Sequence, residues 1–136
     1  MNTALFGISL VSLFSAIAQV ESESGKTSDN VYQISSAYLQ DVNRIIAEKF
    51  KVNGCAIHPA YFYPNEMYSR SASELMMTIY WEYYGNRYLM TTNRLPTAEV
   101  LARIHNGGPD GWKKPSTLIF WKKVKAAMDA AKGAEQ

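Results

Sequence analysis

The segment 71–84 has large apolar side chains on almost every side of the helix that its pattern predicts. Ser71 and Glu74 fit a capping box at its start, and Gly85 fits a stop at its end. A helix that is apolar all round is a buried helix, so we predict that it forms the centre of the fold. Its apolar members are Leu75, Met76, Met77, Ile79, Tyr80, Trp81, Tyr83 and Tyr84.

The length of 136 residues and a hydrophobic fraction of 47% suit one domain over residues 1–136, with 133–136 as a tail. Nine Tyr, five Phe and three Trp supply bulky core material, which excludes a disordered or collagen-like chain. The chain has one cysteine, Cys55, so it forms no internal disulfide and its stability must come from packing. We expect a monomer.

Charge is uneven along the chain. Residues 1–85 hold five basic and eight acidic side chains, whereas residues 86–136 hold nine and four. The formal total of +2 is too weak for a dedicated nucleic-acid binder, so we expect no nucleic-acid partner. The basic half is compatible with an anionic polymer as partner, and the alternative is that it only keeps the chain soluble.

The first twenty residues allow two interpretations. Residues 4–18 are apolar enough for a secretory signal, and Ala16-Ile17-Ala18 has the form of a cleavage site, but no Lys or Arg precedes them. The alternative is a buried helix, because apolar residues recur at three- and four-residue spacings. For residues 1–12 both interpretations, a signal peptide and a helix, remain, whereas for residues 13–21 we predict a helix. The stretch is short for a stable membrane span, and we expect a secreted, periplasmic or cell-wall-facing protein.

The remaining helices are predicted from capping residues and apolar stripes. Residues 31–34 alternate briefly between apolar and polar and predict a short extended segment, whereas residues 51–70 form an irregular connector. The fold is therefore mainly α, with about five helices around the buried central one. Besides the two helices given above, we expect helices from Ser35 or Ser36 to about residue 50, from Pro96 and Thr97 to the glycine turn at 107–109, and from near Ser116 to Gly133.

Several chemistries are excluded by residue type. With His58, His105 and one cysteine, the chain lacks the ligands of a His/Cys zinc site. It has no Gly-x-Ser-x-Gly elbow and no phosphate-binding loop, and we expect no cofactor. The remaining candidate for a catalytic residue is Glu21, at the end of an apolar helix. Burial there would raise the pKa of its carboxyl toward the range of a general acid, and the alternative is a glutamate that frays at a helix end.

Three motifs then resemble those of the lysozyme superfamily. Residues 16–22 are similar to the helix ending in Glu-Ser of lytic transglycosylases and goose-type lysozymes, and residues 31–35 are similar to their Gln-Ile segment. Residues 102–111 resemble the Ala-Arg-Ile-His-Asn-Gly-Gly-Pro-x-Gly signature of invertebrate-type lysozymes. The resemblance implies an α+β lysozyme-like fold, with the extended segment beside a glycan cleft.

On this resemblance, Glu21 takes the place of the catalytic general acid. The family's second carboxylate has no secure match, because the loop from Glu21 to Tyr32 is short; Asp29 is the best candidate and Glu23 the next. The chain also lacks the disulfides of invertebrate-type lysozymes, and Trp112 stands where a cysteine usually follows the glycine signature. The residues expected to bind substrate are Ser22, Tyr32, Gln33, Ile34, His105, Asn106 and Gly107.

The implied activity is that of a muramidase acting on peptidoglycan glycan strands, at the β-1,4 bond between N-acetylmuramic acid and N-acetylglucosamine. Hydrolysis needs two carboxyl groups, about 5–5.5 Å apart for retention or about 6.5–9.5 Å for inversion. With one carboxyl group, the sugar's own hydroxyl attacks, and the products are the anhydro sugars of a lytic transglycosylase. Further alternatives are an inactive glycan-binding module and a structural protein anchored by residues 4–18.

Overall fold

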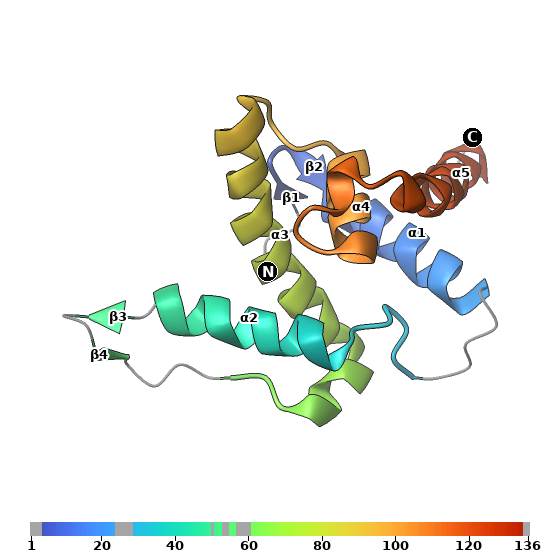
Figure 1. The fold of residues 1–136 in the computed structure, drawn as a ribbon. Coiled ribbons are helices and arrows are strands. Elements are labelled where there is room, and N and C mark those ends of the chain that lie inside the picture. The colour runs from blue at the N-terminus through green and yellow to red at the C-terminus, as the bar shows by residue number, and fades with distance from the viewer. Residues whose placement is uncertain (1–3, 24–28, 50, 53–54, 57–60, 135–136) are drawn as a thin grey trace.

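The computed structural model describes residues 4–23, 29–49, 51–52, 55–56 and 61–134 (Figure 1). Within these residues it contains five α-helices and two small antiparallel hairpins, so the predicted mainly α fold is confirmed. The helices are α1 (Leu10–Glu23), α2 (Ser36–Lys49), α3 (Arg70–Thr92), α4 (Ala98–Gly107) and α5 (Leu118–Ala134). The strands are β1 (Ala4–Leu5), β2 (Ile8–Ser9), β3 (Lys51–Val52) and β4 (Cys55–Ala56), and 3₁₀ turns occur at η1 (Pro64–Tyr68), η2 (Gly111–Lys113) and η3 (Pro115–Thr117).

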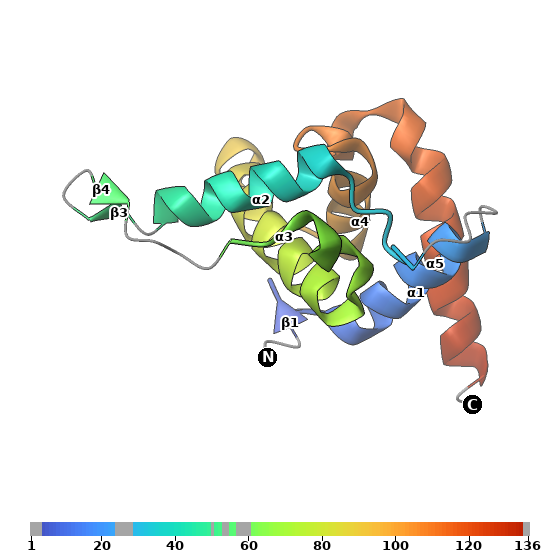
Figure 2. The same ribbon diagram turned by 90° about the horizontal axis from the view of Figure 1, so that it is seen from below.

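Helix α3 crosses the centre of the molecule and packs against both α2 and α4 (Figure 1). Helices α1 and α5 pack against each other on one side, and β3 and β4 lie beyond the far end of α2 on the other (Figure 2). Helix α4 contacts α1, α3 and α5, so it lies where these helices meet. None of the helices in the described ranges is long and apolar enough to cross a membrane.

The central helix is found as predicted, but both of its ends differ. The N-cap is Ser69, whose hydroxyl accepts a hydrogen bond from the backbone N–H of Ala72 at 3.2 Å, so the capping box at Ser71 is wrong by two residues. The helix also continues past Gly85 to Thr92. Gly85 is buried inside the helix, because a Cβ there would lie 2.4 Å from Cε2 of Phe6. Glycine therefore provides room for the Phe6 ring.

The N-terminal segment combines a hairpin and a helix. Strands β1 and β2 pair through Leu5 and Ile8, and the two turn residues, Phe6 and Gly7, have φ of 52° and 77°. Two positive φ values match the tight hairpin turn whose twist suits paired strands. Helix α1 begins at Leu10, so the helix predicted over 13–21 is confirmed, whereas residues 4–9 are not helical.

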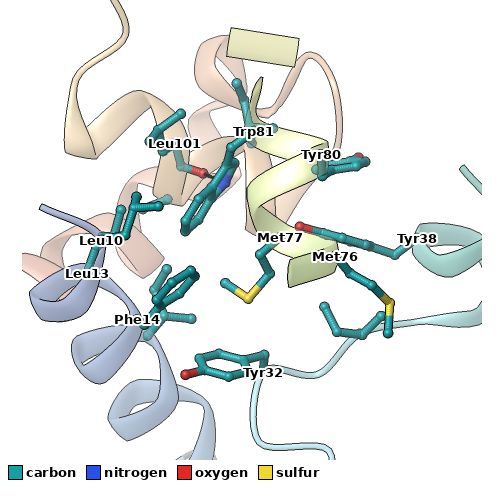
Figure 3. Packing of buried hydrophobic residues seen from close by; sticks show 14 of the residues in the cluster. Leu10, Leu13, Phe14, Tyr32, Tyr38, Met76, Met77, Tyr80, Trp81 and Leu101 are labelled. Carbon is teal, nitrogen blue, oxygen red and sulfur yellow. Dashed lines mark hydrogen bonds between the residues drawn. The ribbon is translucent and has the colours of Figure 1, made fainter. Parts of the chain in front are cut away.

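The core is centred on Trp81 of α3, which has no exposed surface (Figure 3). Its ring stacks on Phe14 of α1, with centroids 5.6 Å apart and planes 15° apart. Its indole N–H donates to the backbone carbonyl of Leu101 on α4 at 2.7 Å. The hydrogen bond offsets the cost of removing the indole N–H from water, so the large ring can be buried and one side chain joins three helices.

The glycine turn after α4 depends on close backbone contact. Gly108 has φ of 89°, a conformation that favours glycine. Gly111 is buried, and a Cβ there would lie 2.1 Å from the backbone oxygen of Arg103. A side chain at Gly111 would therefore push η2 away from α4.

We predict that Gly111→Ala lowers the free energy of unfolding by about 3 kcal/mol, because rigid backbone must shift to admit the methyl group. Gly133→Ala is the matched control, since Gly133 lies in α5 and a methyl group there would have no atom within 4 Å. Alanine there should stabilise the helix by up to about 1 kcal/mol. Urea denaturation followed by circular dichroism measures both. Equal stability of the two variants would contradict the close packing at Gly111.

Candidate active site

Residues 30–34 form a tight turn, here called the 30–34 turn, and not the extended segment that the alternation predicts. The Asn30 amide donates to the carbonyl of Ile34 at 2.7 Å, and its oxygen accepts from the N–H of Ile34 at 2.9 Å. The N–H of Gln33 donates to the carbonyl of Asn30 at 3.0 Å, and Gln33 has φ of 54°. The side chain of Asn30 therefore closes the turn.

The turn directs two of the predicted site residues into the core. Tyr32 and Ile34 are 0% and 1% exposed. The Tyr32 hydroxyl donates to Glu74 on α3 at 2.5 Å. Gln33 remains half-buried, and its side-chain amide donates to the carbonyl of Asn30 at 2.8 Å. The side chains of Tyr32 and Ile34 thus hold the turn in place and have almost no exposed surface.

His105 of α4 joins the 30–34 turn to α2. Its Nε2 lies 2.9 Å from the backbone oxygen of Tyr32, and its Nδ1 lies 3.3 Å from the hydroxyl of Tyr38. Burial lowers the pKa of His105 to about 4, so the ring is neutral near pH 7. A carbonyl only accepts hydrogen bonds, so Nε2 carries the proton and Nδ1 accepts from Tyr38. Both nitrogens are therefore used within the protein.

Two open hollows meet at Asn106, the last residue but one of α4. The Glu21 hollow has a volume of about 320 Å³ and the Asp41 hollow a volume of about 340 Å³. Asn106 is exposed and lines both, so it forms the wall that they share. The Glu21 hollow is lined by Val20, Glu21, Asn106, Ser116, Ile119, Phe120 and Lys123. The Asp41 hollow is lined by Ser35, Ala37, Tyr38, Asp41, Tyr80, His105, Asn106, Gly108 and Pro109.

Glu21 lies in the last turn of α1, half-buried at the side of its hollow. Its neighbour Ser22 is exposed, and the Ser22 hydroxyl donates to the carbonyl of Gln19 at 2.9 Å. Asp29 is exposed and lines neither of the two hollows, and the side chain of Glu23 lies outside the described part of the structure. Glu21 and Asn106 therefore line one hollow, whereas Asp29 is in the lining of neither.

The opposite wall of the Glu21 hollow is fixed by contacts around η3. The Arg103 guanidinium donates from Nε to the Thr117 hydroxyl at 2.8 Å and from Nη2 to the carbonyl of Lys114 at 2.9 Å. Gly107 packs against the same threonine, since a Cβ there would lie 2.5 Å from its Cγ2. These contacts place Ser116 of η3 and Ile119 of α5 in the same hollow as Glu21.

Sequence reasoning missed Asp41 and Tyr80, which line the Asp41 hollow, and Lys123, which lines the Glu21 hollow. Asp41 could have been found, because it lies three residues after Tyr38 and one before Val42. A carboxylate in that position is at the edge of the apolar stripe of α2. No group of three His, Cys, Asp or Glu residues in the described ranges could hold a metal ion.

Comparison with known proteins identifies the family. No protein-family model matches the chain. It is 49% identical over 41 residues to a lysozyme of Magallana gigas and 43% identical over 42 residues to a lysozyme of Ostrea edulis. These two matches span 30% and 31% of the oyster proteins' length, and the same shares of this chain. A third relative, invertebrate-type lysozyme 3 of Caenorhabditis elegans, is 32% identical over 105 residues, which are 75% of this chain and 68% of the relative.

The match to the nematode protein covers most of both chains, and the fold is mainly α with the Glu21 helix beside the glycine motif. The chain therefore belongs to the lysozyme family. The predicted resemblance is confirmed, although the cysteine-rich framework of invertebrate-type lysozymes is absent from the sequence.

We predict that His105 makes stability depend on pH. The unfolded chain takes up a proton at this histidine near pH 6.5, whereas the folded chain does so only near pH 4. The contribution of His105 to the free energy of unfolding is therefore complete above pH 6.5. It falls by up to about 3 kcal/mol as the pH drops toward 4. Urea midpoints measured from about pH 7 to about pH 4.5 test this dependence.

His105→Gln should lose this part of the pH dependence, because glutamine does not titrate. His58→Gln, at the chain's other histidine, is the control and should retain it. If His105→Gln kept the same slope of stability against pH as the parent, the assignment of a neutral buried imidazole would be wrong.

Proposed function

We propose that the chain is a lysozyme that cleaves peptidoglycan, with Glu21 as its general acid. One observation carries the proposal: Glu21 of α1 and Asn106 of α4 line one hollow, although they belong to motifs at opposite ends of the sequence. A carboxyl group at the side of an open hollow can reach the oxygen of a glycosidic bond that lies across it. The substrate is the β-1,4 bond between N-acetylmuramic acid and N-acetylglucosamine.

The hollow combines apolar and charged groups around the acid. Val20, Ile119 and Phe120 line it beside Glu21. The Lys123 ammonium lines the same hollow, where its charge can stabilise the carboxylate that remains once Glu21 has given its proton to the leaving oxygen. The same carboxylate then accepts a proton in the second half of the reaction.

Asn106 serves as the sugar-binding group of the shared wall, because its amide both donates and accepts hydrogen bonds. His105 acts as a positioning residue, since its ring nitrogens connect Asn106's helix to the 30–34 turn. Gly107 lets η3 approach α4. Ser22 and Gln33 remain proposed substrate contacts because both are accessible at the edges of their segments. Tyr32 and Ile34 act through their backbone and through packing.

A second candidate function is lytic transglycosylation. It is favoured by the lining of the Glu21 hollow, in which Glu21 is the only acidic residue among those that the structure describes. With one carboxyl group, the substrate's own hydroxyl closes an anhydro ring. Hydrolysis instead needs a second carboxylate at one of the two separations that glycosidases use, for which Asp29 is the first candidate and Glu23 the next. We propose a monomeric protein that acts outside the cell or at the cell wall in either case.

We predict that Glu21→Gln lowers the rate of fragment release from purified peptidoglycan by at least about 100-fold, because glutamine cannot donate the proton. Fragments are identified by mass spectrometry. Glu82→Gln is the control, since Glu82 is an exposed carboxylate on α3 that pairs with Lys49 on α2. It should release fragments at the parental rate. A fully active Glu21→Gln protein would exclude Glu21 as the acid, and a parent that releases nothing would exclude the enzyme.

We predict that the parental products have reducing ends and that Asp29→Asn lowers their release by at least about 100-fold, because hydrolysis needs the second carboxylate. Asp129→Asn is the control, at an exposed aspartate of α5 that pairs with Lys125. If the parent gave anhydro ends and the Asp29→Asn protein remained active, the reaction would be transglycosylation and not hydrolysis.

A further inference from the structure

Tyr32 connects the helix that carries Glu21 to the helix that carries Asn106. Its ring packs edge-to-face on Phe14 of α1, with centroids 5.9 Å apart and planes at 62° (Figure 3). Its backbone carbonyl accepts the hydrogen bond from Nε2 of His105 on α4 at 2.9 Å. The position of this one residue therefore affects both α1 and α4.

The contacts of Tyr32 bear on the two residues of the proposed active site. Phe14 and Glu21 are seven residues apart, which is about two helical turns, so their side chains leave α1 in nearly the same direction. Asn106 follows His105 directly in α4. Contacts at Phe14 and at His105 therefore help to set the orientation of Glu21 and Asn106, which line one hollow.

The Tyr32 hydroxyl is held by Glu74 of α3. It donates to Oε2 of Glu74 at 2.5 Å, although the predicted capping box assigns this glutamate to the start of its own helix. Burial, followed by the hydrogen bond to Glu74, raises the pKa of Tyr32, so the hydroxyl keeps its proton and acts as the donor. Arg70 Nε lies 3.3 Å from the same oxygen, and its guanidinium carbon lies 5.7 Å from the centre of the Tyr32 ring. Tyr32 is therefore fixed at its ring, its hydroxyl and its carbonyl.

This polar pair costs more to bury than an apolar pair of the same size. Tyr32 has no exposed surface and the Glu74 side chain is 20% exposed, so both polar groups have lost most of their contact with water. A phenylalanine facing a leucine would fill the same space without this cost. What the polar pair adds is direction, because a short hydrogen bond to a carboxylate fixes both the distance and the orientation of the ring.

We propose that Glu74 is a positioning residue of the proposed active site, which acts through Tyr32 to fix Asn106 relative to Glu21. This inference rests on the proposed function. Glu74 is in the lining of neither hollow, so it acts from outside them. A displacement of about 1 Å between a reacting bond and its acid can lower a rate by about 100-fold, so a remote contact that fixes this geometry affects catalysis.

The first test separates the hydrogen bond from the ring. Tyr32→Phe removes the hydroxyl and keeps the ring. We expect kcat for fragment release from soluble glycan strands to fall about tenfold while KM changes less than about threefold, because the sugars still bind but the bond is misplaced relative to Glu21. Tyr68→Phe is the matched control, at an exposed tyrosine of η1, and should keep the parental kcat. A parental kcat in folded Tyr32→Phe would overturn the proposal.

Variants of Glu74 distinguish positioning from stability. Glu74→Gln keeps an oxygen that accepts from Tyr32 and should keep kcat within about twofold, whereas Glu74→Leu should lower it about tenfold. Leucine also leaves the buried Tyr32 hydroxyl without its partner, so this variant is less stable. Combining Glu74→Leu with Tyr32→Phe removes that hydroxyl, so we expect stability in urea to recover and kcat to remain low. If kcat instead recovered with stability, Glu74 would be only structural and the proposal wrong.

An NMR measurement tests the same proposal without cleavage. The Nε2 proton of His105 reports the hydrogen bond to the Tyr32 carbonyl, and the side-chain amide signals of Asn106 report its surroundings. In Tyr32→Phe and Glu74→Leu we expect the Nε2 proton to exchange with water at least about tenfold faster and the Asn106 signals to shift. Tyr68→Phe should match the parent. Unchanged signals in both Tyr32→Phe and Glu74→Leu would overturn the proposal.

The outcomes separate the two proposals. If the parent cleaves and Tyr32→Phe cleaves equally fast, the positioning role is wrong while the proposed enzyme stands. If the parent releases nothing, the proposed enzyme is wrong, and the NMR signals alone decide whether Glu74 positions Asn106. If circular dichroism shows that Glu74→Leu fails to fold, Tyr32→Phe and the double variant decide.

Discussion

The imidazole of His105 joins three segments that are far apart in the sequence. It donates to the carbonyl of Tyr32 in the 30–34 turn and accepts from Tyr38 of α2, while its own backbone lies in α4. Because the ring is buried and neutral, both hydrogen bonds form in a poorly solvated environment, where losing either partner leaves a buried polar group unsatisfied. The next residue, Asn106, forms the wall between the two hollows, so the positions of both depend on this ring.

The three resemblance motifs contribute to the site in different ways. The first supplies a carboxyl group to an open hollow, and the second supplies mainly structure, since Tyr32 and Ile34 are buried. The third supplies an exposed amide at Asn106 together with glycines that allow close packing. Motif matching alone would treat all of them as ligand contacts. Their burial separates those that can touch a sugar from those that position the residues that do.

The central helix was predictable because its composition leaves one possibility, burial on all sides. Its C-terminal end was not predictable. Gly85 lies inside the helix because it makes room for the ring of Phe6, which comes from a distant hairpin. The 30–34 turn was mistaken for an extended segment because side-chain hydrogen bonds from Asn30 override a short apolar alternation. Glu21 and Asn106 could be named from sequence motifs. For Asp41 the sequence signals only its place at the edge of the α2 stripe, because its fixed position depends on Tyr84 and Arg44, which reach it from α3 and from the next turn of α2.

The stacking of Trp81 on Phe14, with its hydrogen bond to Leu101, holds together three helices without any covalent link. With Cys55 as the only cysteine, no internal disulfide supports this arrangement. A thiol reductant therefore has no internal disulfide to break in this chain. Its tolerance of heat is instead set by apolar burial, whose contribution changes with temperature through the heat capacity of unfolding.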